Sequence, residues 1–267
     1  MGEKLGQHFL KDGSVVKKIT DAARLTKDSF VLEVGPGKGI LTEALAKRAK
    51  KVLAIETDAT LVSALKKKFA HTPSVQIICE DILKINLPKL LSSYLPSLTH
   101  YKLVSNLPYY IASPTIRLFL ETLYPPSEMI LMIQKEVAQR ITARPGSMTI
   151  LAVSVHYYAQ AEILFFVPHT AFDPEPQVDS AVIRITRDQR RVISDKERKH
   201  FFRIVRAGFS SKRKILCSNL ANGLSLEKKL IIKKLHLLGL SEKSRAQELS
   251  VAQWEKLSTL LSSHDIP

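Results

Sequence analysis

Short apolar runs alternate with amphipathic stretches through the first half of the chain. The runs 30–34, 52–55, 75–79 and 102–105 consist mostly of Val, Ile, Leu and other apolar residues. Runs of this length without strict alternation are typical of strands that are buried on both faces of a parallel sheet. The segment 40–49, between the first two runs, has helical periodicity instead. The pattern predicts an α/β fold with a Rossmann-like, doubly wound sheet.

The second half of the chain continues the sheet and then changes character. We predict strands at 129–133, 149–157 and 180–185, and helices at 113–124 and 135–143. A proline-rich loop joins the last two strands without a helix, so we expect one of them to run antiparallel. After residue 186 the periodicity is helical, with apolar stripes such as Phe201, Val205 and Phe209. We therefore divide the chain near 187–195 into a Rossmann-like domain, 1–187, and a small all-helical domain, 188–267.

Polar residues follow the predicted parallel strands where each strand ends. Glycines 35, 37 and 39 follow the first strand with G-x-G-x-G spacing, which disfavours the dinucleotide motif G-x-G-x-x-G. Glu56 ends the second strand, 21 residues after Gly35, and is placed to accept the hydroxyls of a ribose. The third strand ends in Glu80 and Asp81, where a carboxylate can meet an adenine amine. Because these strand ends meet at one edge of the sheet, the sequence predicts a nucleoside cofactor there.

The fourth strand ends in Asn106-Leu107-Pro108-Tyr109. An exocyclic adenine amine is a poor nucleophile because its lone pair is delocalised into the ring. The side-chain oxygen of Asn106 and a backbone carbonyl of the Leu107–Pro108 turn could accept its two hydrogens, and the ring of Tyr109 offers a face for stacking. On its own, a strand that ends in Asn-x-Pro is more often a plain turn.

Together these segments resemble the S-adenosylmethionine-dependent methyltransferases and, more closely, the ribosomal RNA adenine N6-dimethyltransferases of the bacterial small-subunit type. The resemblance is carried by the stretches Gly6–Leu10, Glu33–Gly39, Asn106–Tyr109, Gln134–Ala138, Phe172–Val182 and Phe209–Leu216. It spans nearly the whole chain, and Phe172–Val182 is much more specific than a generic methyltransferase signature.

The resemblance implies a site for S-adenosyl-L-methionine and a site for adenine, without a metal. The cofactor pocket comprises His8, Leu10, Gly35, Glu56, Asp81 and Asn106. The catalytic residues are Asn106, Pro108, Tyr109 and Phe172, with Phe172 and Tyr109 enclosing the flipped adenine. The alternative to these functional roles is that His8 is an exposed tail residue and that Phe172 is an aromatic residue of the core. The implied reaction is dimethylation of two adjacent adenosines in the 3′-terminal hairpin of 16S rRNA, in the small (30S) ribosomal subunit or its precursor, with a role in ribosome biogenesis.

One stretch departs from the family pattern. Where the bacterial enzymes usually have a polar Tyr-Gly-Arg-Leu sequence, this chain has the apolar sequence Ile150–Val153. The difference puts the substrate contacts of this stretch in doubt, but not the chemistry.

The charge of the chain supports a nucleic-acid partner. The net charge is +15, and residues 188–267 hold 17 Lys and Arg against 8 Asp and Glu. Arg203, Arg206 and the run Lys212–Lys214 form the densest basic cluster, on one candidate helix. Such a cluster is expected where phosphates are bound. The alternative is that the lysine excess only keeps the protein soluble, and Lys66–Lys68 in particular are expected to be solvated.

Two cysteines, Cys79 and Cys217, lie in apolar contexts and are expected to be buried thiols of a reduced, cytoplasmic protein. Nothing in the sequence indicates a signal peptide, a membrane span or a dimer, so we expect a cytoplasmic monomer. Two rival functions stay open. One is a large-subunit RNA methylase of the antibiotic-resistance type, with a DNA adenine methylase less favoured. The other is a ribosome-assembly factor that acts chiefly as a checkpoint.

Overall fold

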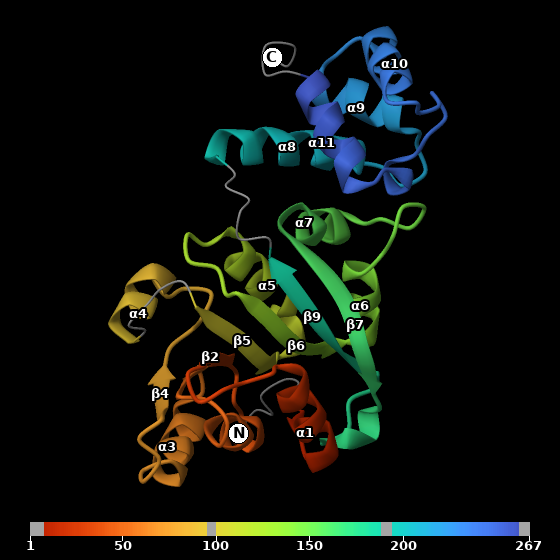
Figure 1. Ribbon diagram of the computed structural model, residues 1–267. Helices are drawn as coiled ribbons and strands as arrows, with labels where there is room; N and C mark the ends of the chain where they lie inside the picture. Colours follow the sequence, from red (N-terminus) through yellow and green to blue (C-terminus); the bar gives the residue numbers. More distant parts are fainter. Residues whose placement is uncertain (1–7, 95–99, 188–193, 262–267) are drawn as a thin grey trace. The chain divides into compact units, whose positions relative to one another are not determined.

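The computed structural model describes residues 8–94, 100–187 and 194–261. The chain forms two compact units (Figure 1). The first comprises residues 1–139 and 159–188, and the second comprises residues 140–158 and 189–267. The second unit therefore includes a segment, 140–158, that the sequence division at 187/188 left in the Rossmann-like domain. Residues 6 and 7 of the N-terminal motif and residues 188–193 of the expected boundary lie outside the described part.

The first unit is built on a seven-stranded sheet in the order β4-β3-β2-β5-β6-β9-β7. Its strands are β2 (Phe30–Val34), β3 (Lys51–Glu56), β4 (Val75–Cys79), β5 (Tyr101–Asn106), β6 (Glu128–Gln134), β7 (Ala159–Val167) and β9 (Ser180–Arg187). The strands β2 to β6 are parallel, whereas β9 is antiparallel to both β6 and β7. This confirms the predicted methyltransferase-type sheet with an antiparallel strand.

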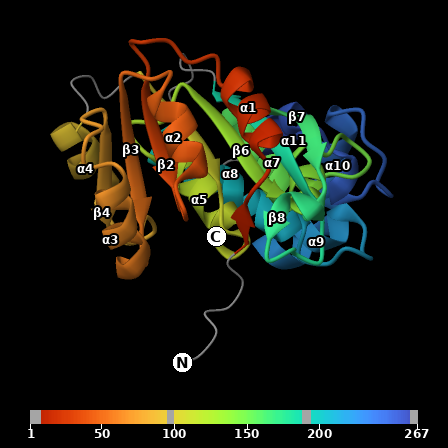
Figure 2. The ribbon, with the colours of Figure 1, turned by 90° about the horizontal axis from the view of Figure 1, so that it is seen from below.

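The helices of the first unit cover both faces of this sheet. They are α1 (Gly13–Ala22), α2 (Ile40–Ala46), α3 (Ala59–Lys68), α4 (Leu87–Tyr94), α5 (Ala112–Glu121) and the start of α6 (Lys135–Ile141). Figure 2 shows α2 against β2 and β3. In the sheet, β3 lies next to β2 on the side away from β5, whereas β6 lies next to β5 on the side away from β2. The connections β2–β3 and β5–β6 therefore run in opposite directions across the sheet. Because such crossovers are right-handed, α2 and α5 cover opposite faces.

The reversal between β2 and β5 creates a crevice at the carboxyl ends of the strands. These two strands pair only from Phe30 to Leu32 on the β2 side and then separate. The buried hydroxyl of Ser105 donates to the Val34 carbonyl and joins the two strands beyond that point. In open α/β sheets, ligands bind at such a switch point.

The second unit is helical and has an aromatic core. Its helices are α7 (Ile150–Tyr158), α8 (Asp195–Gly208), α9 (Leu216–Leu224), α10 (Lys228–Leu237) and α11 (Val251–Leu260). The ring of Tyr157 stacks on Phe201 with 4.0 Å between ring centroids. Trp254 is fully buried and stacks on Phe209. The helical character predicted after residue 186 is confirmed.

The strand predicted at 149–157 is wrong, because this segment forms helix α7 and the strand β7 begins only at Ala159. The segment is apolar on all sides, and Ala152 and Val153 are fully buried. An apolar run of this kind has no periodicity that separates a buried strand from a buried helix. The atypical stretch Ile150–Val153 is consequently the first part of a helix rather than a loop.

Two further expectations need correction. The basic cluster does not lie on one helix: α8 ends at Gly208, and Lys212–Lys214 lie in the following loop. This loop is held by the Asn219 amide, which donates to the carbonyls of Gly208 and Ser211. Cys79 is exposed, because it ends the edge strand β4, whereas Cys217 is buried as expected.

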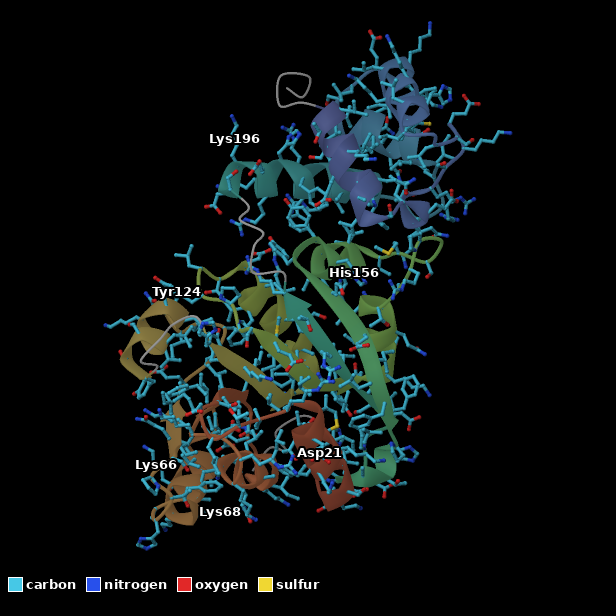
Figure 3. All side chains as sticks on the ribbon, in the orientation of Figure 1. Asp21, Lys66, Lys68, Tyr124, His156 and Lys196 are labelled. Atoms are coloured by element: carbon cyan, nitrogen blue, oxygen red, sulfur yellow. The ribbon has the colours of Figure 1, made fainter. Side chains whose placement is uncertain are left out.

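The lysines at the end of α3 are exposed, as expected (Figure 3). Lys68 nonetheless forms an ion pair with Glu43, at 3.3 Å, and thus links α3 to α2. None of the helices in the described ranges combines the length and the apolar composition of a membrane span. The same residues contain no group of three or more His, Cys, Asp or Glu side chains that could hold a metal ion.

Candidate active site

A cavity of about 390 Å³ lies at the switch point of the first unit. Its volume is within the range of pockets that enclose small ligands. All the site residues that the sequence singled out line it. They are His8, Leu10, Gly35, Glu56, Asp81, Asn106, Pro108, Tyr109 and Phe172. The structure therefore brings together residues from four strand ends, the N-terminal segment and the loop before β9.

Glu56 presents a buried carboxylate to this cavity from the end of β3. Its Oε1 accepts hydrogen bonds from the backbone N–H groups of Thr57 and Asp58, at 2.8 and 3.1 Å. Its Oε2 accepts one from the N–H of Gly37, at 3.3 Å. A carboxylate oxygen can accept two hydrogen bonds, so Oε2 retains capacity for a hydroxyl group. The carboxylate is thus held rigidly next to the glycine turn.

Gly35 allows the backbone after β2 to approach the turn after β5. Its φ of 68° lies in the left-handed region, and a Cβ atom here would be 3.0 Å from Cδ of Pro108. Gly37 has a φ of 56°, and a Cβ atom there would be 3.0 Å from the Phe9 ring. Any side chain at Gly35 would therefore displace the turn that carries Asn106, in addition to straining the backbone.

The Asn106–Tyr109 turn lines the cavity and contains acceptors that have no partner among the described residues. The N–H of Leu107 donates to the Met132 carbonyl of β6, and the carbonyl of Pro108 accepts from the N–H of Ile111. Within the described part of the chain, the Asn106 side chain and the Leu107 carbonyl have no hydrogen-bond partner. Both are therefore available to accept hydrogens from a bound amine.

The ring of Tyr109 is fixed by a contact that the sequence did not reveal. Its hydroxyl is 2.8 Å from the hydroxyl of Ser180, the first residue of β9, which is fully buried. Burial raises the pKa of the Tyr109 hydroxyl, and the hydrogen bond with Ser180 opposes that shift. The phenol is thus neutral at physiological pH and serves as an anchor for the ring.

The N-terminal segment crosses the cavity and pairs with the segment that contains Phe172. Strand β1 (Phe9–Leu10) is antiparallel to β8 (Phe172–Asp173), with Leu10 opposite Phe172. The Nδ1–H group of His8 donates to the carbonyl of Pro174, at 2.7 Å. His8 is thus fixed beside the cavity, and Phe172, which is 1% exposed, both lines the cavity and belongs to the core.

Glu33 lies beneath the cavity and is almost fully buried. Loss of hydration raises the pKa of its carboxyl to about 8. The hydrogen bond from the Thr42 hydroxyl, at 2.7 Å, opposes the shift, and the charge of Glu56 adds to it. The site thus places a carboxyl that is readily protonated near neutral pH beside the fixed carboxylate of Glu56.

Comparisons with known proteins agree with this geometry. Residues 2–263 match the family model described as ribosomal RNA adenine dimethylase. The chain belongs to this family. A Dehalococcoides mccartyi protein named ribosomal RNA small subunit methyltransferase A is 43% identical over 95% of this chain and 86% of that protein.

Two solved structures share the fold over nearly their whole length. A dimethyladenosine transferase from Plasmodium falciparum has a TM-score of 0.81 and 26% identity, covering 97% of this chain and 99% of that one. The 23S rRNA methyltransferase ErmE has a TM-score of 0.75 and 25% identity, covering 95% and 99%. As a ribosomal RNA adenine dimethylase, the chain is an S-adenosylmethionine-dependent N6-dimethyltransferase.

The cavity of this dimethylase fits S-adenosylmethionine. Glu56 has an oxygen that can still accept from a ribose hydroxyl, and Gly35 and Gly37, which both line the cavity, have no side chain between the ligand and the backbone. Ile82, which is buried, contributes an apolar wall for a flat ring. Asp81 is less available, because its Oδ1 accepts from the N–H of Leu83 and its Oδ2 is 3.4 Å from Nζ of Lys84.

Proposed function

We propose that this dimethylase acts on the small ribosomal subunit and dimethylates two adjacent adenosines in the 3′-terminal hairpin of 16S rRNA. The chemistry rests on one observation: Asn106 and Leu107, which carry acceptors left free within the described residues, line the same cavity as Glu56 with its fixed carboxylate. The substrate rests on the D. mccartyi relative, whose name specifies the small subunit. Residues 188–267, with their net charge of +9, are the proposed RNA-binding part.

In the proposed mechanism, the protein supplies alignment rather than acid–base catalysis. S-adenosylmethionine, when bound, provides a methyl group on a positively charged sulfur. Glu56 would hold the ribose, with His8, Leu10, Gly35 and Asp81 around the rest of the cofactor. The Asn106 Oδ1 atom and the Leu107 carbonyl would accept the two hydrogens of the adenine amine, which directs the nitrogen lone pair out of the ring plane.

The target base would be held between aromatic rings. Tyr109, fixed by Ser180, would stack on one face of the adenine, and Phe172 would close the other side. Base–aromatic stacking contributes about 1–3 kcal/mol per base, which offsets much of the cost of unstacking the base from its RNA. After methyl transfer the extra proton leaves the amine to water, so no described side chain has to act as a base before attack.

Transfer of labelled methyl groups tests this proposal. The protein is incubated with S-adenosylmethionine carrying a labelled methyl group and with small or large ribosomal subunits, intact or stripped of protein. We expect label in N6-dimethyladenosine of the small-subunit RNA. Label confined to large subunits would instead support the rival function of a large-subunit RNA methylase; ErmE is itself named a 23S rRNA methyltransferase.

A second candidate function is a checkpoint in ribosome assembly, favoured by the basic helical region. It is compatible with the enzymatic function, and an Asn106 variant separates the two. If methylation alone matters, cells that carry the variant should show the same maturation defect as cells without the protein. Normal growth and ribosome maturation with an inactive Asn106 variant would show that binding is what matters. We place the enzyme in the cytoplasm, in accordance with its unpaired cysteines, and expect it to act as a monomer.

A further inference from the structure

Tyr110 is an exposed aromatic side chain at the mouth of the active-site cavity. It is 74% exposed, whereas Tyr109 beside it is half-buried and anchored by Ser180. Isolated apolar side chains on a surface are ordinary and need no explanation. Tyr110 differs because it lines the same cavity as Asn106 while most of its surface faces solvent. No part of the proposed chemistry requires it.

The backbone under Tyr110 is well held. Tyr110 is the middle residue of a 3₁₀ turn, Tyr109–Ile111, which is closed by the hydrogen bond from the Ile111 N–H to the Pro108 carbonyl, at 3.1 Å. Helix α5 follows directly at Ala112. A ring on a short turn between a strand end and a helix loses little freedom on binding, which is what a stacking surface requires.

Flipping the target adenosine leaves its neighbour in the RNA without a stacking partner on one side. Proteins that bind single-stranded RNA stack such bases on exposed aromatic rings. We propose that the ring of Tyr110 is the stacking surface for the nucleotide next to the target adenosine. This inference rests on the proposed RNA substrate, in which that neighbour is itself an adenosine, a purine with a large surface for stacking.

Three variants test the assignment. Tyr110→Ala removes the ring, and Tyr110→Phe keeps it without the hydroxyl. Phe166→Ala is the matched control, because Phe166 is also exposed, at 54%, and is not among the described residues that line the cavity. We expect Tyr110→Ala to raise KM for small subunits about 5- to 50-fold, with cofactor affinity unchanged. Tyr110→Phe and Phe166→Ala should remain within about twofold of the wild type, because neither removes the stacking ring.

The decisive comparison uses RNA with an abasic nucleotide beside the target adenosine. Such RNA can be prepared by ligating a synthetic 3′ segment to the small-subunit RNA before the particle is assembled. If Tyr110 stacks on the neighbouring base, Tyr110→Ala should have no further effect on this substrate. An unchanged KM for Tyr110→Ala on normal subunits, or an equal loss on both substrates, would overturn the assignment. Failure of the wild type to methylate small subunits would instead overturn the proposed function, and this assignment with it.

Discussion

The hydrogen bond between Tyr109 and Ser180 leads to the most detailed prediction. Ser180→Ala leaves the Tyr109 hydroxyl without its only partner in the described structure, 2.8 Å away. An unsatisfied buried hydroxyl costs about 1–3 kcal/mol. Because Tyr109 is only half-buried and its hydroxyl can recover some hydration from the cavity, we expect the low end, about 1 kcal/mol of unfolding free energy. A looser ring should also slow methyl transfer about tenfold, since misplacement of the reacting groups is costly.

A double-mutant cycle isolates this contact. Tyr109→Phe keeps the stacking ring and removes the hydroxyl, which leaves Ser180 as the unsatisfied group. In the Tyr109→Phe background, Ser180→Ala should cost no further free energy of unfolding, because the Tyr109 hydroxyl is already absent. The coupling energy between the two changes should therefore be about 1 kcal/mol. Unfolding in urea and single-turnover methyl transfer are the two measurements. Strictly additive losses in both would refute the idea that Ser180 acts through Tyr109.

Two further predictions concern stability. For Glu33 the folded-state pKa of about 8 lies above the ordinary 4.5, so this group stabilises the fold fully below pH 4.5, and that contribution is lost as the pH rises through 8. In ligand-free protein, the free energy of unfolding should therefore decline by up to about 1.4 kcal/mol per pH unit between pH 5 and 8. Glu33→Gln should remove this decline, and a pH profile of urea unfolding that the variant leaves unchanged would contradict the prediction. Gly208→Ala would place a Cβ atom 2.4 Å from the buried Trp254 and should destabilise the second unit by about 1–3 kcal/mol, measured by fluorescence of this single tryptophan. Gly13→Ala, with nothing within 4 Å, is the matched control; equal effects of the two changes would show that packing against Trp254 is unimportant.

Much of the first unit was predictable because local pattern and global fold agree there. The strands β2 and β4 have the same bounds in sequence and structure, and Glu56 and Asn106 lie at strand ends as predicted. In a parallel sheet the carboxyl ends of all strands lie at the same edge, so residues at these ends were expected to converge. Short apolar runs that are followed by glycine or acidic residues left little room for error in placing these strands.

The remaining features depend on contacts that sequence patterns do not encode. The segment 150–158 is apolar on every side, so only packing in the second unit determines that it is helical. Ser180 contacts Tyr109 across 71 positions, and no spacing rule connects a serine at a strand start with a tyrosine after another strand. The pairing of Leu10 with Phe172 involves strands of two residues, too short to produce a period.

The role of Asn106 is the central claim, and one pair of measurements on Asn106→Ala tests it most directly. The first is cofactor affinity by calorimetry, and the second is single-turnover transfer of methyl groups to small subunits. If Asn106 holds the adenine amine, transfer should fall at least about 100-fold while cofactor affinity changes only slightly, because Glu56 and the glycine turn remain intact. Transfer at the wild-type rate by this variant would contradict the account.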